Sequence, residues 1–465
     1  MNMITHETYA ARRTHLSQRV SRPIMLVGCG TRLRNLPINE LPFRQDSSFL
    51  YLTGCNLPNA AVIIEEDHCT LFLPAPADDD ALWHGHVKTL EDHKRHFGVD
   101  AVIDIELLDK HCKDRKLATL AVADVTATQR AATLAGVPLS YGKENGDDLL
   151  IDALIAMRQI KDKEEIDELR AAAICTAQAF HAAMAATHPG GTEAHVAALF
   201  RASLAARGLS EGYKPIVTVR GEILHNPTYR NSIKSGQLLL LDGGGERSSG
   251  YTVDITRTWP VSGRFQGKQG AAYSAVLDAQ LGAIELVRPG IRYREVHDRA
   301  AAVLTQWLRD EGLLRGTMDE LRETQAHAAF FPHGIGHHLG LDVHDLEQFG
   351  DRAAYPPGRG RDGNFGTAYL RMDMDMAPGM VVTVEPGFYV VPAILRDPAL
   401  REKWGSQVDW DLSETWTGFG GIRIEDDVLC TDSSPEVLTA TTIKDVHDLE
   451  DLVGSGIPAI ERFRP

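Results

Sequence analysis

The chain has 465 residues, more than one compact hydrophobic core usually holds, and this length suits two or three domains. Hydrophobic residues make up 43% and charged residues 24%, which is typical of globular proteins and excludes a disordered or fibrous chain. The net charge of -16 argues against nucleic acid as the main partner, because phosphate binding needs a clustered basic surface.

The cysteines and the apolar runs indicate the compartment. The six cysteines are scattered without a C-x-x-C pair, which is not a disulfide framework and favours a reducing environment. The first residues, MNMITHETYAARRTHL, lack the apolar centre of a signal peptide. No apolar run approaches the roughly 18 residues that a membrane helix needs. We therefore expect a cytoplasmic protein with no membrane partner.

Three short apolar runs between about residues 20 and 160 predict buried strands. They are Pro23 to Gly28, Ala60 to Glu65 and Cys69 to Pro74, each bounded by glycine, proline or acidic turn residues. Helical stretches alternate with these runs. The pattern predicts an α/β N-terminal domain over residues 1–157.

The pattern changes after this point. From Lys161 to about Thr187, apolar residues recur at helical spacing until Pro189 and two glycines end the run. Two more helices are expected over about 271–287 and 293–308, and an irregular loop over 350–375. Strands are expected over 237–242, 251–259, 380–385 and 421–430. Residues 158–465 are therefore predicted to form an α+β domain, with helices packed on a largely antiparallel sheet.

Four carboxylates lie in or at the end of these apolar strands. They are Asp242, Asp254, Glu385 and Glu425. One such residue is most often a strand end that faces solvent. Four in one domain are different, because an ionised carboxylate among buried strands is costly unless a cation or hydrogen bonds compensate it. The pattern favours one or two bound divalent ions.

The segment FFPHGIGHHLGLDVHD offers nitrogen ligands. It places His333, His337, His338 and His344 within 12 residues, separated by glycines that let the backbone pass close to a site. A single histidine is more often a satisfied core or surface residue than a ligand. Oxygen ligands with one imidazole suit Mn(II) or Co(II) better than a thiolate-type zinc site. The residues alone leave open which histidine is the ligand.

Alternation along the last strand gives a local test. Arg423 and Glu425 are expected on one face, with Ile422 and Ile424 on the other, so that an arginine and a carboxylate share a cavity. The alternative is an ion pair on the surface, which contributes little. Other catalytic motifs are missing: DGGGE lacks the phosphate-loop pattern, and there is no G-x-S-x-G elbow.

Several of these motifs together resemble a known family. In order, LLLLDGGGERSSGYTVDITRTWPVSGRF, HGIGHHLGLDVHD, VEPGFYVV and GGIRIEDDVL resemble the pita-bread metallopeptidases, and within them the proline-specific aminopeptidase P and prolidase group. FRQDSSFLYLTGCNLPNA and ALWHG resemble the N-terminal domain of that group. The resemblance covers nearly the whole chain. It implies an α/β domain followed by a pita-bread catalytic domain.

The resemblance also implies an activity. The chain would be a Xaa-Pro aminopeptidase, a metallo-exopeptidase that releases the N-terminal residue from peptides with proline in the second position. A hydroxide that bridges two metal ions would attack the peptide carbonyl. The alternative within the family is a prolidase that hydrolyses only Xaa-Pro dipeptides. A binding module that has lost its metals is disfavoured, since all five ligands of the family are present, and the same ligands exclude a metal-free creatinase-like hydrolase.

The resemblance assigns the metal ligands one by one. Asp242 would bind one ion, Asp254 and Glu425 would bridge both, and His337 and Glu385 would complete the second site. His337 is chosen because it stands seven positions before His344, as the ligand does in the family. The ions would be two divalent metals, with Mn2+ expected first and Co2+ or Zn2+ as alternatives.

Further roles follow from the same resemblance. Glu385 would also relay a proton. His225 and His344 would bind substrate and stabilise the tetrahedral intermediate, and Arg423 would orient Glu425. Trp83 and Tyr389 match aromatic positions that line the proline pocket or the cleft.

Two departures from the family concern the substrate. The loop between Asp242 and Asp254 is slightly longer than in compact relatives, and the stretch from Tyr389 to Gly418 is longer and more like prolidases. Loops at the mouth of a cleft decide which peptides fit, so the length of the peptide stays open. We expect a homodimer or homotetramer, as in relatives.

Overall fold

The computed structural model describes residues 4–463 apart from residues 37 and 78, and it contains two compact units. The N-terminal unit comprises Met1–Gln159 and Leu346–Gly350, and the C-terminal unit comprises Ile160–Asp345 and Asp351–Pro465. The domain limits predicted from the sequence, 1–157 and 158–465, differ slightly from the limits of these units and stay a prediction.

The N-terminal unit is built on a four-stranded sheet in the order β1-β2-β3-β4. The first two pairs are antiparallel, and β3 and β4 are parallel. Every residue of β1, β2 and β3 is buried, which explains why these strands are visible as continuous apolar runs. The elements are α1 (His6–Arg19), β1 (Ile24–Val27), α2 (Ser47–Thr53), β2 (Ala61–Ile64), β3 (Cys69–Leu73), α3 (Asp80–His84), α4 (Leu90–Phe97), β4 (Ala101–Asp104), α5 (Leu108–Cys112), α6 (Val125–Ala135) and α7 (Asp148–Gln159). The predicted strands and the α/β class are confirmed.

The long helices of the C-terminal unit form where the sequence predicts them. They are α8 (Lys163–Ala185), α10 (Gln269–Ile284) and α11 (Tyr293–Asp310). Helix α8 begins with a capping box, in which Asp162 and Glu165 satisfy each other's backbone N–H groups. The remaining helices are α9 (Glu193–Ala205), α12 (Met318–Thr324), α13 (Asp351–Ala354), α14 (Pro392–Leu395), α15 (Pro398–Trp404), α16 (Trp410–Glu414), α17 (Val446–Leu452) and α18 (Ala459–Arg462).

The strands of this unit pair in an antiparallel manner, as expected. The paired sets are β6-β7-β9, β10-β13-β14, β11-β12 and β5-β8. The strands are β5 (Ser210–Glu211), β6 (Ile216–Thr218), β7 (Leu238–Asp242), β8 (Gly245–Glu246), β9 (Thr256–Pro260), β10 (Val381–Val384), β11 (Gly387–Tyr389), β12 (Gly421–Arg423), β13 (Asp426–Leu429) and β14 (Glu436–Val437).

Two predicted strands differ from the structure. The run 251–259 becomes a strand only from Thr256, because the N–H of Asp254 is bound by the carboxylate of Asp427 rather than by a neighbouring strand. The run 421–430 is two strands, since β12 pairs with β11 while β13 pairs with β10. Between them, the N–H of Glu425 donates to the carbonyl of Thr256 at 3.0 Å.

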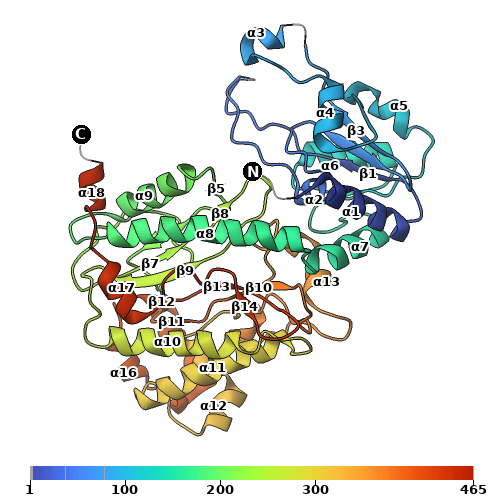
Figure 1. Ribbon diagram of the computed structural model, residues 1–465. Coiled ribbons are helices and arrows are strands. Elements are labelled where there is room, and N and C mark those ends of the chain that lie inside the picture. The colour runs from blue at the N-terminus through green and yellow to red at the C-terminus, as the bar shows by residue number, and fades with distance from the viewer. Residues whose placement is uncertain (1–3, 37, 78, 464–465) are drawn as a thin grey trace. The chain divides into compact units, whose positions relative to one another are not determined.

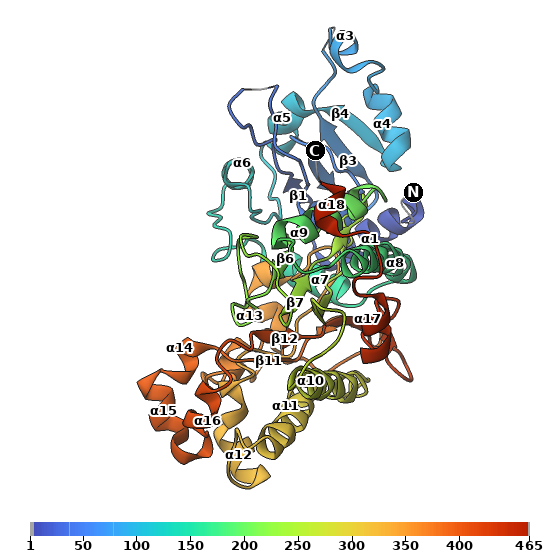
Figure 2. The ribbon, with the colours of Figure 1, turned by 90° about the vertical axis from the view of Figure 1, so that its left-hand side faces the viewer.

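The helices cover the strands of the C-terminal unit from two sides. Helices α8 and α9 lie along one side of the strands, and α10 and α11 along the other (Figure 1). Figure 2 shows α14, α15 and α16 grouped near α12, and the indole N–H of Trp404 on α15 donates to the carbonyl of Thr324 at 3.1 Å. The predicted loop 350–375 is irregular apart from α13 and one turn at Thr367–Tyr369. Among the described residues, no helix is long and apolar enough to span a membrane.

A buried histidine on α11 makes the stability of this unit sensitive to acid. His297 is 1% exposed, and neither of its ring nitrogens has a hydrogen-bond partner among the described residues. It packs against His327 and Phe331. Burial lowers the pKa of His297 to about 3, with the neighbouring His327 adding to the effect. The folded state therefore accepts a proton on His297 only at a much lower pH than the unfolded state does.

We predict that His297→Leu flattens the dependence of stability on pH. Because the folded pKa lies below the unfolded value near 6.5, folding stability is lost as the pH falls from about 6.5 towards about 3. At pH 5 the substitution should remove a penalty of about 2 kcal/mol, measured as the free energy of unfolding in denaturant. Leu304→Ala, which alters a buried residue of the same helix without removing a titratable group, is the control; it should lower stability but leave the slope unchanged. Equal slopes in His297→Leu and the parent protein would contradict the prediction.

Candidate metal centre

A cavity of about 750 Å³ lies in the C-terminal unit and is lined by residues of that unit alone. Its walls are formed by residues from three stretches, 213–227, 332–344 and 361–371, and by residues at strand ends, namely Asp242, Asp254, Glu385, Arg423 and Glu425. All five residues predicted as metal ligands line it, and so do His225, His344 and Arg423. The predicted loop 350–375 thus provides one wall of the site.

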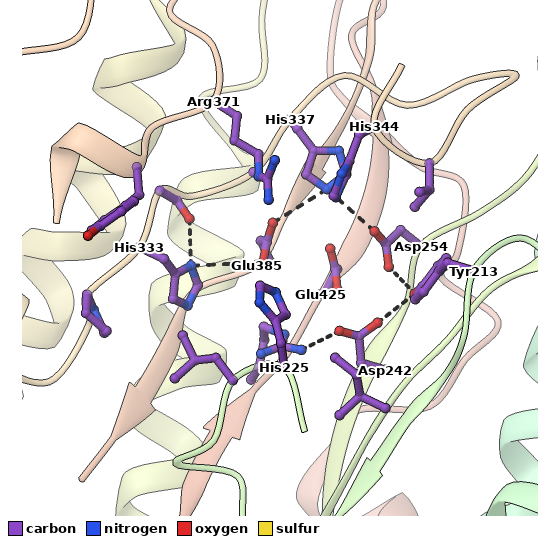
Figure 3. A pocket seen from close by; sticks show the side chains of 18 of the residues that line it. Tyr213, His225, Asp242, Asp254, His333, His337, His344, Arg371, Glu385 and Glu425 are labelled. Atoms are coloured by element: carbon purple, nitrogen blue, oxygen red, sulfur yellow. Dashed lines mark hydrogen bonds and ion pairs between the residues drawn. The ribbon is translucent and has the colours of Figure 1, made fainter. Parts of the chain in front are cut away.

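The carboxylates come from four strand ends. Asp242 is the last residue of β7, Asp254 precedes β9, Glu385 follows β10, and Glu425 lies in the break between β12 and β13. Figure 3 shows these carboxylates directed towards one another inside the cavity. Arg423 and Glu425 both line it, while Ile422 and Ile424 are buried in the core, as strand alternation predicts.

His337 is held at this cluster by its backbone and by its own ring. The segment around it runs antiparallel to β10, with hydrogen bonds from the N–H of Glu385 to the carbonyl of Ile335 and from that of Thr383 to the carbonyl of His337. The Nδ1 atom lies 3.0 Å from the carbonyl oxygen of His338 and donates to it. In the neutral ring, Nε2 is therefore the acceptor that a metal ion would use. It lies 3.5 Å from Asp254 Oδ2 and 3.7 Å from Glu385 Oε1, so the protonated ring is attracted to both carboxylates.

Two glycines permit these close approaches. A Cβ atom on Gly336 would lie 2.3 Å from the carbonyl oxygen of Thr383, so that only glycine lets the histidine segment pack on β10. A Cβ atom on Gly244 would lie 1.6 Å from the carbonyl oxygen of Val253. The glycine run DGGGE thus serves the hairpin that brings Asp242 and Asp254 together.

The donor atoms form overlapping groups that fit a metal pair. Three sets each place their ligand atoms within 4.8 Å of one another. These sets are Asp242 with Asp254 and Glu425, His337 with Glu385 and Glu425, and Asp254 with His337 and His344. Asp254, Glu425 and His337 each belong to two sets. A carboxylate has two oxygens and can bind two neighbouring ions, whereas an imidazole has one free nitrogen, so Asp254 and Glu425 are the candidates for shared ligands. Oxygen donors with one or two imidazoles suit borderline divalent metals.

The pKa values of the clustered carboxylates indicate that a nearby positive charge would stabilise their ionised forms. Burial raises the pKa of Glu425 well above its usual range, and repulsion by Asp254 and Glu385 adds to this. Burial likewise raises the pKa of Asp242, against the opposing charge of Arg423, and raises that of Glu385 to about 7. Burial would raise the pKa of Asp254 as well, but a hydrogen bond from His337 and its charge outweigh it and lower that pKa. Bound cations would offset this repulsion and stabilise the ionised carboxylates.

Arg423 and Thr256 connect the carboxylates. The Nη2 atom of Arg423 forms an ion pair with Asp242, and its Nε donates to the Thr256 hydroxyl at 3.0 Å. That hydroxyl donates in turn to Glu425 Oε2 at 2.6 Å. The hydroxyl of Tyr213 lies 2.6 Å from Asp242 Oδ1 and within hydrogen-bond distance of Asp254. These contacts fix the rotamers of three carboxylates.

Tyr389 and Trp83 lie elsewhere than the cavity wall. Tyr389 is buried, and its hydroxyl lies 3.1 Å from Arg423 Nη1 and 3.0 Å from His333 Nε2. It is not among the residues that line the cavity, so its place is behind Arg423. Trp83 is on α3 in the N-terminal unit, with 72% of its surface exposed. Contact of either residue with substrate stays a prediction.

Several residues that line the cavity were not predicted from the sequence. Tyr213, Phe365, Tyr369 and Arg371 line the cavity but stand in stretches that have no periodicity. Arg371 lies close enough for its charge to lower the pKa of His344, which burial takes to about 3. The ring of His344 meets that of His337 edge-on at 4.4 Å between centroids. An arginine and two aromatic residues in one predicted loop are the signal that would have pointed to a wall of the site.

Family models match both parts of the chain. The family described as Metallopeptidase family M24 matches residues 167–432, and the one described as Aminopeptidase P, N-terminal domain, matches residues 9–120. The first match covers more than half of the chain.

Individual proteins match over nearly their whole length. A probable Xaa-Pro aminopeptidase of Ajellomyces capsulatus is 34% identical, over 96% of this chain and 95% of the relative. A probable Xaa-Pro aminopeptidase of Verticillium alfalfae is 32% identical, over 93% and 92%. Among solved structures, aminopeptidase PepP of Pseudomonas aeruginosa has a TM-score of 0.80 and 28% identity, covering 99% and 100% of the two chains. Zinc-substituted Escherichia coli aminopeptidase P in complex with product has a TM-score of 0.78 and 28% identity, covering 97% and 98%.

Asp254 and Asp242 should differ in how many metal ions are lost when each is replaced. Asp254→Asn should lose both ions because its carboxylate is shared, whereas Asp242→Asn should lose one. The measurement is the metal content of protein equilibrated with Mn2+ and then desalted. Asp373→Asn removes a buried carboxylate outside the cluster and is the matched control, which should keep both ions. Two ions retained in Asp254→Asn would show that it does not bridge.

Proposed function

We infer that this chain, which belongs to metallopeptidase family M24, is a metal-dependent Xaa-Pro aminopeptidase with an N-terminal domain of the aminopeptidase P type and a pita-bread catalytic domain. It is a metallo-exopeptidase that acts on peptides. The observation that carries this conclusion is the set of five metal-ligand side chains around one cavity, in a chain that matches Xaa-Pro aminopeptidases from end to end.

We propose the metal roles that the overlapping donor sets support. Asp242 would hold one ion, His337 and Glu385 the other, and Asp254 and Glu425 both. When bound, divalent ions supply a Lewis acid for the scissile carbonyl and make a nucleophile available near neutral pH. Mn2+ is the ion we propose, with Co2+ and Zn2+ as alternatives, since oxygen donors dominate the set.

The protein side chains would handle protons and charge. Glu385 is the group best placed to accept and pass on a proton, because burial brings its pKa to about 7 and a bound cation would lower it from there. His225 and His344 line the cavity from different stretches of chain, and both are neutral at pH 7 because burial lowers the pKa of each. Neutral imidazoles can donate N–H hydrogen bonds to the oxygen that becomes negative when the carbonyl is attacked.

The remaining wall of the cavity suits a proline ring. Apolar side chains line it beside the polar cluster, namely Pro215, Ile216, Leu224, Pro227, Pro332, Val343 and Phe365. An Xaa-Pro bond has no N–H at the proline, so an apolar surface leaves no donor unsatisfied there. The cavity is therefore compatible with recognition of proline after the scissile bond.

The inserted stretch that resembles prolidases does not reach the cavity. Residues 390–418 fold into α14, α15 and α16, and none of these described residues lines the site. The length of that stretch is thus no argument for a substrate limited to dipeptides. The curated relatives that match are named Xaa-Pro aminopeptidases, which also favours longer peptides over the prolidase alternative.

We propose a cytoplasmic location and an assembly of two or four chains. The location is supported by the six cysteines, all of which are free thiols, as in a reducing compartment. Partner chains are supported by the exposed apolar side chains of Leu33, Leu82 and Trp83 in the N-terminal unit.

Peptide length separates the two candidate activities. We expect the Mn2+-loaded enzyme to release the first residue of an Xaa-Pro-Yaa tripeptide at least as fast as it cleaves the matching Xaa-Pro dipeptide. The assay compares kcat/KM for the two peptides at the same metal concentration, with Xaa-Ala-Yaa as the control for proline selectivity. Cleavage confined to the dipeptide would establish the prolidase activity instead.

His344 tests whether a histidine next to the ligands binds substrate or metal. If it stabilises the reacting oxygen, His344→Ala should lower kcat about 100-fold or more while the protein keeps two ions. Steady-state kinetics and metal content would be measured on the same preparation. Loss of an ion would instead make His344 a ligand, as its proximity to Asp254 and His337 allows.

A further inference from the structure

A second group of polar side chains lies on the far face of the strands that carry the metal ligands. It consists of Arg257, Gln280, Asp426 and Lys444, which we call the back-face network. Side chains alternate along these strands. Glu425 lines the cavity and its carboxylate accepts from the Thr256 hydroxyl, whereas the next residues, Arg257 and Asp426, do not line the cavity and bond to each other. Arg257, Gln280 and Asp426 are fully buried. None of the four lines the cavity.

Every N–H group of Arg257 is used. A guanidinium has five N–H donors. Its Nη1 donates to the carbonyls of Glu425 at 2.6 Å and Thr256 at 3.0 Å, and its Nη2 to Asp426 Oδ1 and to the carbonyl of Thr442, both at 2.7 Å. Nε donates to the carbonyl of Ile443 at 3.0 Å. One side chain therefore holds three separate stretches of backbone.

Asp426 extends these contacts to the helix behind the strands. Its Oδ2 accepts from Lys444 Nζ at 2.6 Å and from Gln280 Nε2 on α10 at 3.0 Å, and its Oδ1 also accepts from the Thr439 hydroxyl at 2.7 Å. Gln280 Nε2 further lies 3.3 Å from the carbonyl oxygen of Val384, which it can reach as a donor. Val384 immediately precedes the metal-ligand candidate Glu385.

The network binds the backbone at the point where β12 ends and β13 begins. At Glu425 the chain changes from β12 to β13, and an isolated antiparallel bridge joins its backbone to Thr256. Arg257 binds the carbonyls of both residues of this bridge. The N–H of Asp254 is bound by the carboxylate of Asp427 at 3.1 Å, also outside a ladder. The two residues with shared ligand atoms thus stand on backbone held by side chains.

Stability alone does not account for such a network. A buried ion pair loses hydration that its mutual attraction repays only in part, and apolar side chains of similar size often give equal stability. A planar arginine with five hydrogen-bonded N–H groups fixes the directions of its acceptors, which apolar packing does not. It fixes the backbone carbonyls of Thr256 and Glu425 relative to each other, and with them the Glu425 carboxylate and the Thr256 hydroxyl that donates to it.

We propose that Arg257 is a positioning residue that sets the separation between Asp254 and Glu425 and thereby the affinity of the centre for its two ions. This rests on the metal roles proposed above. Lysine at the same position keeps the charge but has one donor group in place of a planar fork. Arg257→Lys should therefore bind Mn2+ tenfold to a hundredfold more weakly than the parent protein, the range for residues that orient metal ligands.

The test titrates metal-free full-length protein with Mn2+ by calorimetry and records the electron paramagnetic resonance signal of the loaded centre. We expect weaker binding and an altered coupling between the two ions in Arg257→Lys. Lys444→Met provides a second variant in case Arg257→Lys does not fold, because Lys444 is partly exposed and Arg257 still holds Asp426. It should weaken binding in the same direction by a smaller factor.

Leu308→Ala is the control for general destabilisation. None of the hydrogen bonds of the network involves this buried residue of α11, so Leu308→Ala should lower the melting temperature and leave Mn2+ affinity and coupling unchanged. Parent-level affinity in both network variants would overturn the proposal, and so would an equal loss of affinity in Leu308→Ala. No substrate is used, so a parent protein that binds two ions without cleaving Xaa-Pro peptides would refute the proposed activity and leave this inference intact.

Discussion

Repulsion among four buried carboxylates is the constraint on which the catalytic unit depends. Burial and mutual repulsion disfavour the ionised forms of Asp242, Glu385 and Glu425, and the ionised form of Asp254 is favoured only because His337 outweighs the effect of burial. The fold brings them together nonetheless, and it uses rigid parts to do so. Each carboxylate stands at the end or break of a fully buried strand, where apolar residues such as Leu241, Val384 and Ile424 pack in the core. Arg423 and Tyr213 offset part of the cost from within the site, and divalent cations would offset much of the rest.

The sequence was informative where a residue's burial contradicts its chemistry. Asp242 after four leucines and Glu385 after a valine-rich run stand out because polar groups in apolar strands require a reason. Long helices such as α8 and α11 were equally visible, because their apolar periodicity extends over many turns. Alternation also placed Arg423 and Glu425 in the same cavity, although the strand breaks between them.

Other parts of the site could not be found in this way. Tyr213 and Arg371 stand in irregular stretches, where no period relates one residue to the next and only the folded chain brings them to the cavity. The strand ends near Asp254 and Glu425 were misplaced because side chains there replace backbone partners, which a pattern of apolar residues does not record. Tyr389 follows the ligand motif closely in sequence, yet its side chain lies behind Arg423 and does not line the cavity, which sequence position alone does not reveal.

The back-face network also bears on how the protein is made. Arg257 donates to the carbonyls of Glu425, Thr442 and Ile443, which stand 168, 185 and 186 positions later in the chain. Asp426 accepts from Lys444 as well as from Arg257. Contacts of such long range form late, because the intervening chain must be synthesised and its loop closed first. During translation, a chain not yet extended past Thr441 holds all five candidate metal ligands but lacks the carbonyls of Thr442 and Ile443 that Arg257 binds and the charge of Lys444 beside Asp426. The metal centre should therefore reach its final geometry only after residues 442–444 have been added and have packed against the strands.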